Sequence, residues 1–124
     1  MSNPIQCGNS NNSDYDWSPS VPIEGTWECG ADEFSKYMSE LTIERDCPSQ
    51  KNLFNKCCIS HDHCYDAQLG QKYCDDIFCD CILVAAGNNE ICAKEDVPSF
   101  CGLVREFGAE PYFRSRPNSS NKTV

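Results

Sequence analysis

One histidine and two nearby carboxylates have the residue types of a hydrolytic site. His61 and Asp62 lie in residues 56–66, which read Lys-Cys-Cys-Ile-Ser-His-Asp-His-Cys-Tyr-Asp, and Asp75 lies in a second cysteine-rich segment, residues 73–81. A carboxylate that accepts a hydrogen bond from one imidazole nitrogen fixes the tautomer and leaves the other nitrogen free to take a proton. A second carboxylate beside such a base could bind a hard cation. The pattern therefore indicates a general base, its orienting carboxylate and a cation ligand.

Two helices are expected to position these groups. In both segments, apolar and cysteine side chains recur at the spacing of one helix face. Gly70 lies between the segments and would end the first helix, and so short a connection favours antiparallel packing. The spacing predicts one helix over residues 50–67, capped by Ser49, and a second over residues 72–86.

The cysteines predict the register of this helix pair. In antiparallel helices, residues at the same height have position numbers with a constant sum. Two cysteine pairs give the same sum, Cys57 with Cys81 and Cys64 with Cys74. One register would therefore close two disulfides about two helical turns apart. His61 lies between them, close to the level of Asp75, so this register also predicts the imidazole beside the carboxylate.

Neighbouring residues have plainer interpretations. Asp66 and Asp80 are better explained as solvated helix surface in an acidic protein. His61 and His63 are not expected to share a transition metal, because residues two apart on a helix point roughly 200° apart. A Cys–His protease is disfavoured, because every cysteine near His61 has a better use in a bridge. For the histidine and the two carboxylates named first, the pattern favours a function.

The two segments resemble a known family. Cys-Cys-x-x-His-Asp-x-Cys-Tyr at residues 57–65 is similar to the active-site helix of the secreted phospholipase A2 superfamily, and Cys74-Asp75 followed by Cys81 resembles its second long helix. The resemblance covers residues 53–86 and is greatest to the atypical group XII enzymes and to phospholipase A2-like proteins of nematodes. It implies a mainly α, disulfide-rich fold with two long antiparallel helices linked by disulfides.

The resemblance also implies roles for individual residues. His61 would be the general base for water, Asp75 its orienter, Asp62 a ligand of Ca²⁺, and Tyr65 a structural hydroxyl bonded to Asp75. The implied reaction is calcium-dependent hydrolysis of the sn-2 ester of glycerophospholipids, which releases a fatty acid and a lysophospholipid. The alternative from a different class is a non-catalytic secreted protein that binds lipid or protein on the same scaffold.

The other calcium ligands are expected in a loop before the cysteine pair. The family has a glycine-rich loop of the form Cys-x-Cys-Gly-x-Gly-Gly there, and residues 27–32, Trp-Glu-Cys-Gly-Ala-Asp, are the part of this chain that resembles it. The candidate loop ligands are Glu28, Gly30 and Asp32. An ordinary surface loop pinned by Cys29 is the alternative interpretation. Cys58 is expected to pair with Cys29 and to anchor this loop beside Asp62.

Composition indicates the compartment. The chain of 124 residues is one domain by length, and its eleven cysteines are typical of a disulfide scaffold from an oxidising environment. The spacing of these cysteines does not match paired zinc knuckles. Acceptor sequons at Asn11, Asn118 and Asn121 agree with a secreted, extracellular glycoprotein. Residues 1–6 lack the pattern of a signal peptide, so we expect a mature form or a fragment.

Charge and hydropathy restrict the partners. The formal net charge is -9. Residues 114–124 hold three basic side chains and no acidic one, so residues 1–113 carry a charge of -12. Such a field repels nucleic acid and anionic lipid, and no apolar run approaches a transmembrane length. For a lipid substrate we therefore expect peripheral contact with zwitterionic surfaces.

The chain divides into three expected regions. Residues 1–28 form a polar N-terminal arm, residues 29–113 the phospholipase A2-like domain, and residues 114–124 a disordered tail. A short helix is expected within residues 29–48. A second amphipathic helix would carry Phe100, Leu103, Val104 and Phe107 and end at Gly108.

The spacing of residues also gives expectations for residues 92–101 and for the helix face that follows Asp75. Residues 92–101 are expected to be an acidic loop, for which a bridge between Cys92 and Cys101 is one option. The pairing of Cys7, Cys47, Cys79, Cys92 and Cys101 is left open, with Cys7 as the candidate unpaired cysteine. Phe78 and Ile82 follow Asp75 on its helix face. They would line an acyl-chain channel or pack in the core, and the sequence leaves both options open.

Overall fold

The computed structural model describes residues 25–117 as a set of helices, and no strand occurs within this range. The helices are α1 (Glu33–Asp46), α2 (Lys51–Asp66), α3 (Gln71–Ala86), α4 (Val97–Phe107) and α5 (Ala109–Arg114). A 3₁₀ turn over Pro48–Gln50 precedes α2, and a π-helical segment over Cys92–Asp96 precedes α4. No helix in the described range is long and apolar enough to cross a membrane.

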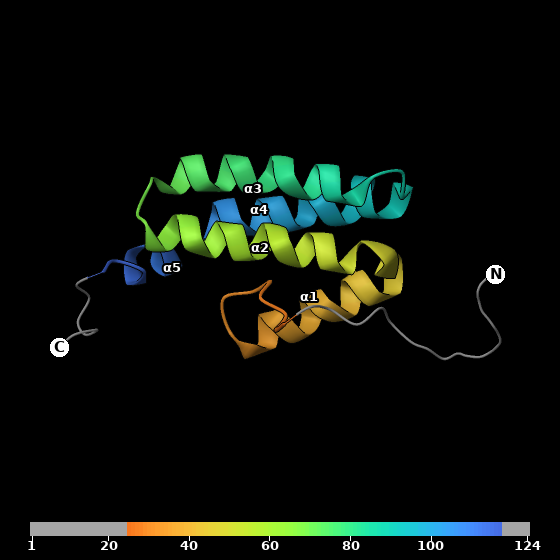
Figure 1. Ribbon diagram of the computed structural model, residues 1–124, viewed down its shortest axis with the longest axis horizontal. Coiled ribbons are helices and arrows are strands. Elements are labelled where there is room, and N and C mark those ends of the chain that lie inside the picture. Colours follow the sequence, from red (N-terminus) through yellow and green to blue (C-terminus); the bar gives the residue numbers. More distant parts are fainter. Residues whose placement is uncertain (1–24, 118–124) are drawn as a thin grey trace.

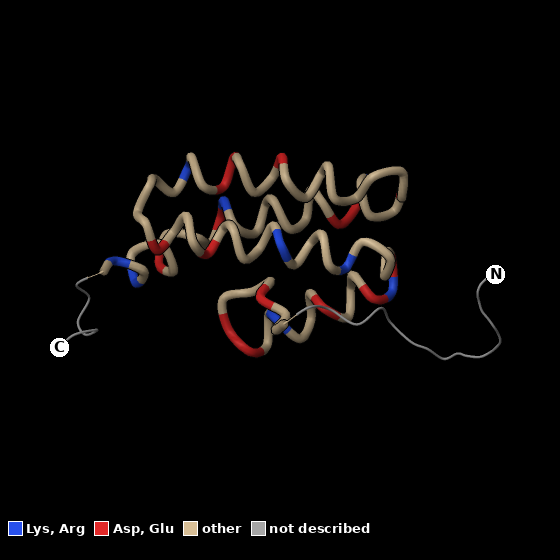
Figure 2. Tube along the Cα trace, viewed as in Figure 1, with Lys and Arg blue, Asp and Glu red and all other residues tan. Residues whose placement is uncertain are grey.

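The two long helices form the frame of the molecule. Figure 1 shows α2 and α3 side by side, α4 packed against α3, α1 below α2 in this view, and α5 near the connection between α2 and α3. Within that connection Gly70 has a φ of +116°, in the region that favours glycine. Figure 2 shows charges of both signs along all five helices. The prediction of two long antiparallel helices is confirmed.

The start of α2 differs from the prediction. Pro48–Gln50 forms the 3₁₀ turn, and Gln50 holds the N-cap position without a side-chain hydrogen bond, so the predicted cap by Ser49 is wrong. Ser49 lies inside the turn, where it precedes the first residue of α2 by two positions. A cap residue must directly precede the first helical residue for its side chain to reach the free N–H groups.

The disulfides of the helix seam confirm the predicted register. Cys57–Cys81 and Cys64–Cys74 both join α2 to α3 with Cα–Cα separations of 5.7 Å. The predicted bridge from Cys29 to Cys58 is present as well. Three of the bridges thus follow from the spacing of the cysteines and the resemblance.

The acidic loop expected over residues 92–101 is wrong, and the bridge considered between Cys92 and Cys101 does not form. Cys92 pairs with Cys47 at the end of α1, and Cys101 pairs with Cys79 on α3. The segment between them is helical rather than a loop. Nine residues of helix separate its ends by roughly 13 Å, about twice what a disulfide can span. Cys7 lies outside the described residues.

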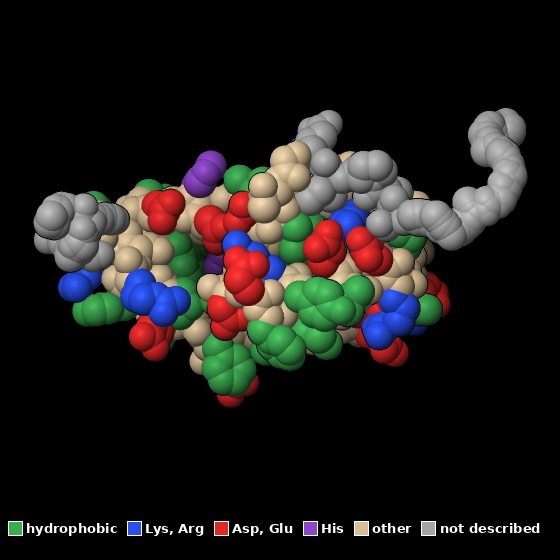
Figure 3. All heavy atoms as spheres, turned by 90° about the horizontal axis from the view of Figure 1, so that it is seen from below, with side chains coloured by type: hydrophobic (Ala, Val, Ile, Leu, Met, Phe, Trp, Pro, Cys, Tyr) green, Lys and Arg blue, Asp and Glu red, His purple; other side chains and the backbone are tan. Residues whose placement is uncertain are grey.

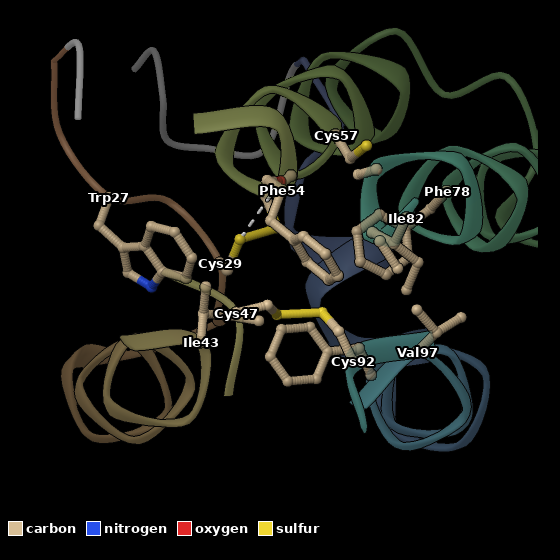
Figure 4. Packing of buried hydrophobic residues seen from close by; sticks show 14 residues of the cluster. Trp27, Cys29, Ile43, Cys47, Phe54, Cys57, Phe78, Ile82, Cys92 and Val97 are labelled. Carbon is tan, nitrogen blue, oxygen red and sulfur yellow. Dashed lines mark hydrogen bonds between the residues drawn. A yellow bond between two sulfur atoms is a disulfide. The ribbon is translucent and has the colours of Figure 1, made fainter. Parts of the chain in front are cut away.

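The core lies between α1, α2, α3 and α4. Phe54 and Phe100 pack edge to face with their centroids 5.9 Å apart, and the Cys47–Cys92 bridge lies among the buried rings (Figure 4). Trp27 belongs to this core although it lies in the predicted N-terminal arm, and its Nε1 donates to Ser39 Oγ at 2.9 Å. The chain just before α1 is therefore packed against the helices.

Helix α1 exposes most of its large apolar side chains. An Asp32–Ser35 capping box starts this helix. Its fully buried apolar residue is Ile43. The exposed ones are Phe34, Tyr37, Met38 and Leu41. Figure 3, seen from the side of α1, shows hydrophobic side chains gathered along one edge of this face.

Candidate functional site

The helix seam brings His61 and Asp75 into direct contact. His61 Nε2 lies 2.7 Å from Asp75 Oδ1, and Asp75 is 1% exposed. An ionised carboxylate only accepts hydrogen bonds, so the proton of a neutral ring lies on Nε2. Nδ1 is then left as an acceptor, which is the arrangement that a general base requires.

Two further donors hold the Asp75 carboxylate. Tyr65 Oη donates to Oδ1 at 2.8 Å, and Gln71 Nε2 donates to Oδ2 at 3.2 Å. Burial and the neighbouring Asp75 raise the pKa of Tyr65, so the phenol remains a donor. With His61, three donors fix this buried charge, which meets the usual condition for a buried carboxylate.

Aromatic rings fix the orientation of the imidazole. The centroid of the His61 ring lies 4.3 Å from that of Tyr65 and 4.8 Å from that of Phe78. Phe78 is buried and also lines the cavity in front of His61. Phe78 therefore packs in the core and also borders the cavity, whereas Ile82 is fully buried in the core.

A glycine permits the close approach of α5 to this dyad. A Cβ at Gly108 would overlap the hydroxyl of Tyr65 and the carbonyl oxygen of Val104. The ring of Tyr112 on α5 then packs edge-on against Tyr65 at 5.0 Å, and its hydroxyl accepts from Gly70 N at 2.9 Å. The end of the chain therefore supports the tyrosine that holds Asp75.

An apolar cavity of about 350 Å³ opens in front of the imidazole. Its wall comes from α3 and α4 on one side and from residues 28–32 on the other. Helix α4, which was predicted as an amphipathic helix ending at Gly108, is present and supplies the apolar side chains Phe100, Leu103, Val104 and Phe107. Such a cavity suits an apolar chain attached to a group that reacts at His61.

A second, polar hollow of about 410 Å³ adjoins the apolar cavity, and the two share Glu28, Gly30, Ala31, Asp62, Tyr65 and Pro111. Its charged lining comprises Glu28, Asp62, Asp66, Lys36 and Arg114. Asp62 is exposed at the surface; partial desolvation by the residues around it, together with the negative charges of Glu28 and Asp66, raises the pKa of Asp62 to about 6. The hollow therefore contains negative charge that a cation would offset.

The three predicted loop residues occupy different environments. Glu28 Oε1 lies 3.5 Å from Lys36 Nζ. Gly30 has a φ of +144°, and a Cβ there would overlap the first turn of α1. Both line the polar hollow with Asp62. The Asp32 carboxylate instead accepts from Ser35 N at 2.8 Å as the N-cap of α1.

The donor chemistry of the hollow suits a hard cation, because carboxylate and carbonyl oxygens are the ligands that Ca²⁺ prefers. Side chains alone would not complete a coordination shell. In the described range, the one group of three candidate metal-binding side chains within 4.8 Å is Cys47, Cys92 and Asp96, and its two sulfurs form a disulfide. A calcium ion beside Asp62 would need backbone carbonyls or water as well.

Sequence reasoning missed two polar residues that build the site. Gln71 lies four residues before Asp75 on the same helix face, and that spacing was the available signal. Asn55 is buried on α2, where Oδ1 accepts from Glu28 N at 2.7 Å and Nδ2 donates to Thr26 O at 3.0 Å. Asn55 thus ties the loop of residues 26–28 to the active-site helix.

Comparison with known proteins finds one named relative. Over 102 residues, or 82% of this chain, the sequence is 48% identical to a phospholipase A2-like protein of Caenorhabditis elegans. The chain spans 59% of the length of that relative. No family model matches the chain, and no solved structure matches it.

Proposed function

Over the 102 residues that they share, this chain belongs to the same family as the nematode phospholipase A2-like protein, and on that basis we propose that it is a secreted, calcium-dependent phospholipase A2. The reaction is hydrolysis of the sn-2 ester of a glycerophospholipid to a fatty acid and a lysophospholipid. The observation that carries this proposal is the 2.7 Å contact of His61 with Asp75, with His61 lining an apolar cavity.

His61 is the general base in this proposal. Its Nδ1 takes a proton from a water molecule while the water oxygen bonds to the ester carbonyl carbon. Asp75 stabilises the resulting imidazolium through the Nε2 proton. When the bond between the carbonyl carbon and the glycerol oxygen breaks, His61 gives the proton to that oxygen and the ring becomes neutral again. No covalent intermediate with the protein is needed.

Asp62 would hold the calcium ion, with Glu28 and the backbone of Gly30 as further ligands from the polar hollow. When bound, calcium supplies positive charge that stabilises the negative charge developing on the ester carbonyl oxygen. Asp32 is the third predicted loop ligand. Its carboxylate would have to leave Ser35 N to contribute.

The surroundings of the dyad support a lipid substrate. The cavity is lined by apolar side chains of α4, and two of them, Leu103 and Phe107, are exposed at the same time. An exposed apolar side chain that also lines a cavity suits a peripheral contact with lipid. The net charge of -9 favours zwitterionic over anionic surfaces. The five disulfides agree with an extracellular location.

The alternative is a non-catalytic lipid- or protein-binding protein on the same scaffold. Its support is that the described carboxylates do not converge on a closed metal site. The complete dyad weighs against it, because a binding protein has no need of an imidazole held by a carboxylate with two further donors.

Fatty-acid release from phosphatidylcholine vesicles tests the proposal. Wild-type protein should hydrolyse the lipid with calcium and stop when a chelator is added. His61→Gln should lose at least about 100-fold in rate, because the base is removed. His63→Gln is the matched control, since this histidine is exposed on the same helix. Persistent hydrolysis by His61→Gln would place the chemistry elsewhere, and the absence of both hydrolysis and calcium binding would favour the binding protein.

A further inference from the structure

A lysine side chain lines the polar hollow. Lys36 projects from the first turns of α1, its side chain is only 28% exposed, and its Nζ lies 3.5 Å from Glu28 Oε1. We propose that the Lys36 ammonium is an internal counter-ion for the Glu28–Asp62 hollow, and that calcium must displace it from Glu28 in order to bind. This inference rests on the proposed calcium site.

The backbone fixes where Lys36 enters the hollow. Lys36 N donates to the carbonyl oxygen of Asp32 at 2.9 Å, within the capped first turn of α1. Gly30 packs against the same turn, so closely that a Cβ there would overlap the Lys36 backbone nitrogen. The loop that would supply calcium ligands and the helix that supplies the ammonium are therefore in direct contact.

Lys36, Glu28 and Asp62 line the same polar hollow, so the ammonium is a counter-ion shared by both carboxylates of the proposed calcium site. The other cation of the hollow, Arg114, pairs with Glu110 at 3.8 Å. Lys36 pairs with one of the proposed calcium ligands, Glu28.

This arrangement makes calcium and the ammonium competitors. A divalent ion bound between Glu28 and Asp62 would meet a like charge and would have to replace the Lys36–Glu28 contact. A unit charge about 5 Å from a divalent ion at a partly solvated site weakens binding by roughly tenfold or more. Lys36 would therefore keep calcium affinity low and make calcium binding depend on movement of its side chain.

Calorimetric titration with calcium alone tests the inference without an activity readout. Lys36→Met keeps the length and apolar stem of the side chain and removes its charge, so it should bind calcium about tenfold more tightly than wild-type protein. Lys36→Arg keeps the charge and should bind calcium as wild-type protein does. Lys72→Met is the matched control, because Lys72 is 85% exposed on α3 and pairs with Asp76, away from the hollow. This control should leave the affinity unchanged within about twofold, since a distant exposed charge is screened.

Unchanged or weaker calcium binding by Lys36→Met would overturn the inference, as would a failure of both wild-type protein and Lys36→Met to bind calcium. Lys36→Gln provides a second neutral variant if the methionine variant does not fold. Hydrolysis of phosphatidylcholine by wild-type protein tests the proposed function separately. Tighter calcium binding by Lys36→Met without hydrolysis would uphold the role of Lys36 and refute the enzyme, whereas hydrolysis with unchanged affinity would do the reverse.

Discussion

We expect Asp96→Asn to stabilise the protein at slightly alkaline pH. Asp96 is 5% exposed, and its Oδ2 has no hydrogen-bond partner within the described part of the chain. It lies beside the Cys47–Cys92 bridge and next to Asp46, whose carboxylate accepts from Arg45 Nε and Nη2 at 2.7 and 2.8 Å. A buried carboxylate in this position is costly in its charged form.

The pKa values of the pair give the direction and size of the effect. Burial, a hydrogen bond between the Asp96 and Asp46 side chains and the charge of Asp46 raise the pKa of Asp96 from 3.8 to about 7, while Arg45 opposes the shift. The Arg45 bond lowers the pKa of Asp46. The folded state therefore holds a proton on Asp96 that the unfolded state has lost between about pH 4 and 7, so stability falls as pH rises through this window.

A rise of about three units corresponds to roughly 4 kcal/mol at most, and the lowered pKa of Asp46 offsets part of it. Asparagine has the same shape and no charge to bury. Asp96→Asn should therefore match wild-type protein near pH 4 and exceed its free energy of unfolding at pH 8 by about 2–4 kcal/mol.

Urea unfolding with the disulfides intact measures this difference. The comparison is between wild-type protein and Asp96→Asn at pH 5 and pH 8, with Asp80→Asn as the control at an exposed position on α3. The control should change the free energy of unfolding by less than about 0.5 kcal/mol. The reasoning is refuted if Asp96→Asn is no more stable than wild-type protein at pH 8, or if the two differ equally at both pH values.

Three further substitutions test the framework of the site. Asp75→Asn should slow phospholipid hydrolysis by roughly tenfold to 100-fold, less than the loss of the His61 base, because a misoriented imidazole still accepts a proton part of the time; an equal loss in both variants, measured as fatty-acid release, would contradict this order. Gly108→Ala should lower the free energy of unfolding by about 1–3 kcal/mol, because its Cβ would push the Tyr65 hydroxyl away from its partner; an unchanged thermal midpoint would show that α5 can shift at no cost. Asn55→Ala should cost about 1–3 kcal/mol in chemical denaturation by leaving the backbone groups of residues 26–28 unpaired, and a neutral result would mean that water replaces the side chain.

The helix pair could be predicted because its geometry is repetitive. Once residues 56–66 and 73–81 are taken as antiparallel helices, the positions of Cys57 and Cys64 determine their partners, and the contact of His61 with Asp75 follows. No long-range packing information is needed, since one connection and one register fix the arrangement.

The remaining bridges depend on how separate segments pack. Cys47 meets Cys92 because the π-helical segment packs against the end of α1, and no local pattern in either segment reports that contact. Asn55 was missed because asparagine is usually found at the surface. Its burial here depends on the loop that its side chain binds. The contact between Lys36 and Glu28 was missed as well, because a helix cap lies between the two residues and the sequence spacing did not reveal that cap.

The disulfides have a further consequence when they are considered as a network. Cys29–Cys58 joins the segment before α1 to α2, the two seam bridges join α2 to α3, Cys79–Cys101 joins α3 to α4, and Cys47–Cys92 returns from the start of α4 to the end of α1. The connections form a closed cycle, so cutting any one of them leaves the four helices joined through the others. These links limit how far α1 to α4 can move apart to admit a bulky ligand. Helix α5, whose Pro111 lines the cavity, lies outside the cycle. Ligand entry should therefore depend on side-chain rotation and on movement of α5 rather than on separation of the four linked helices.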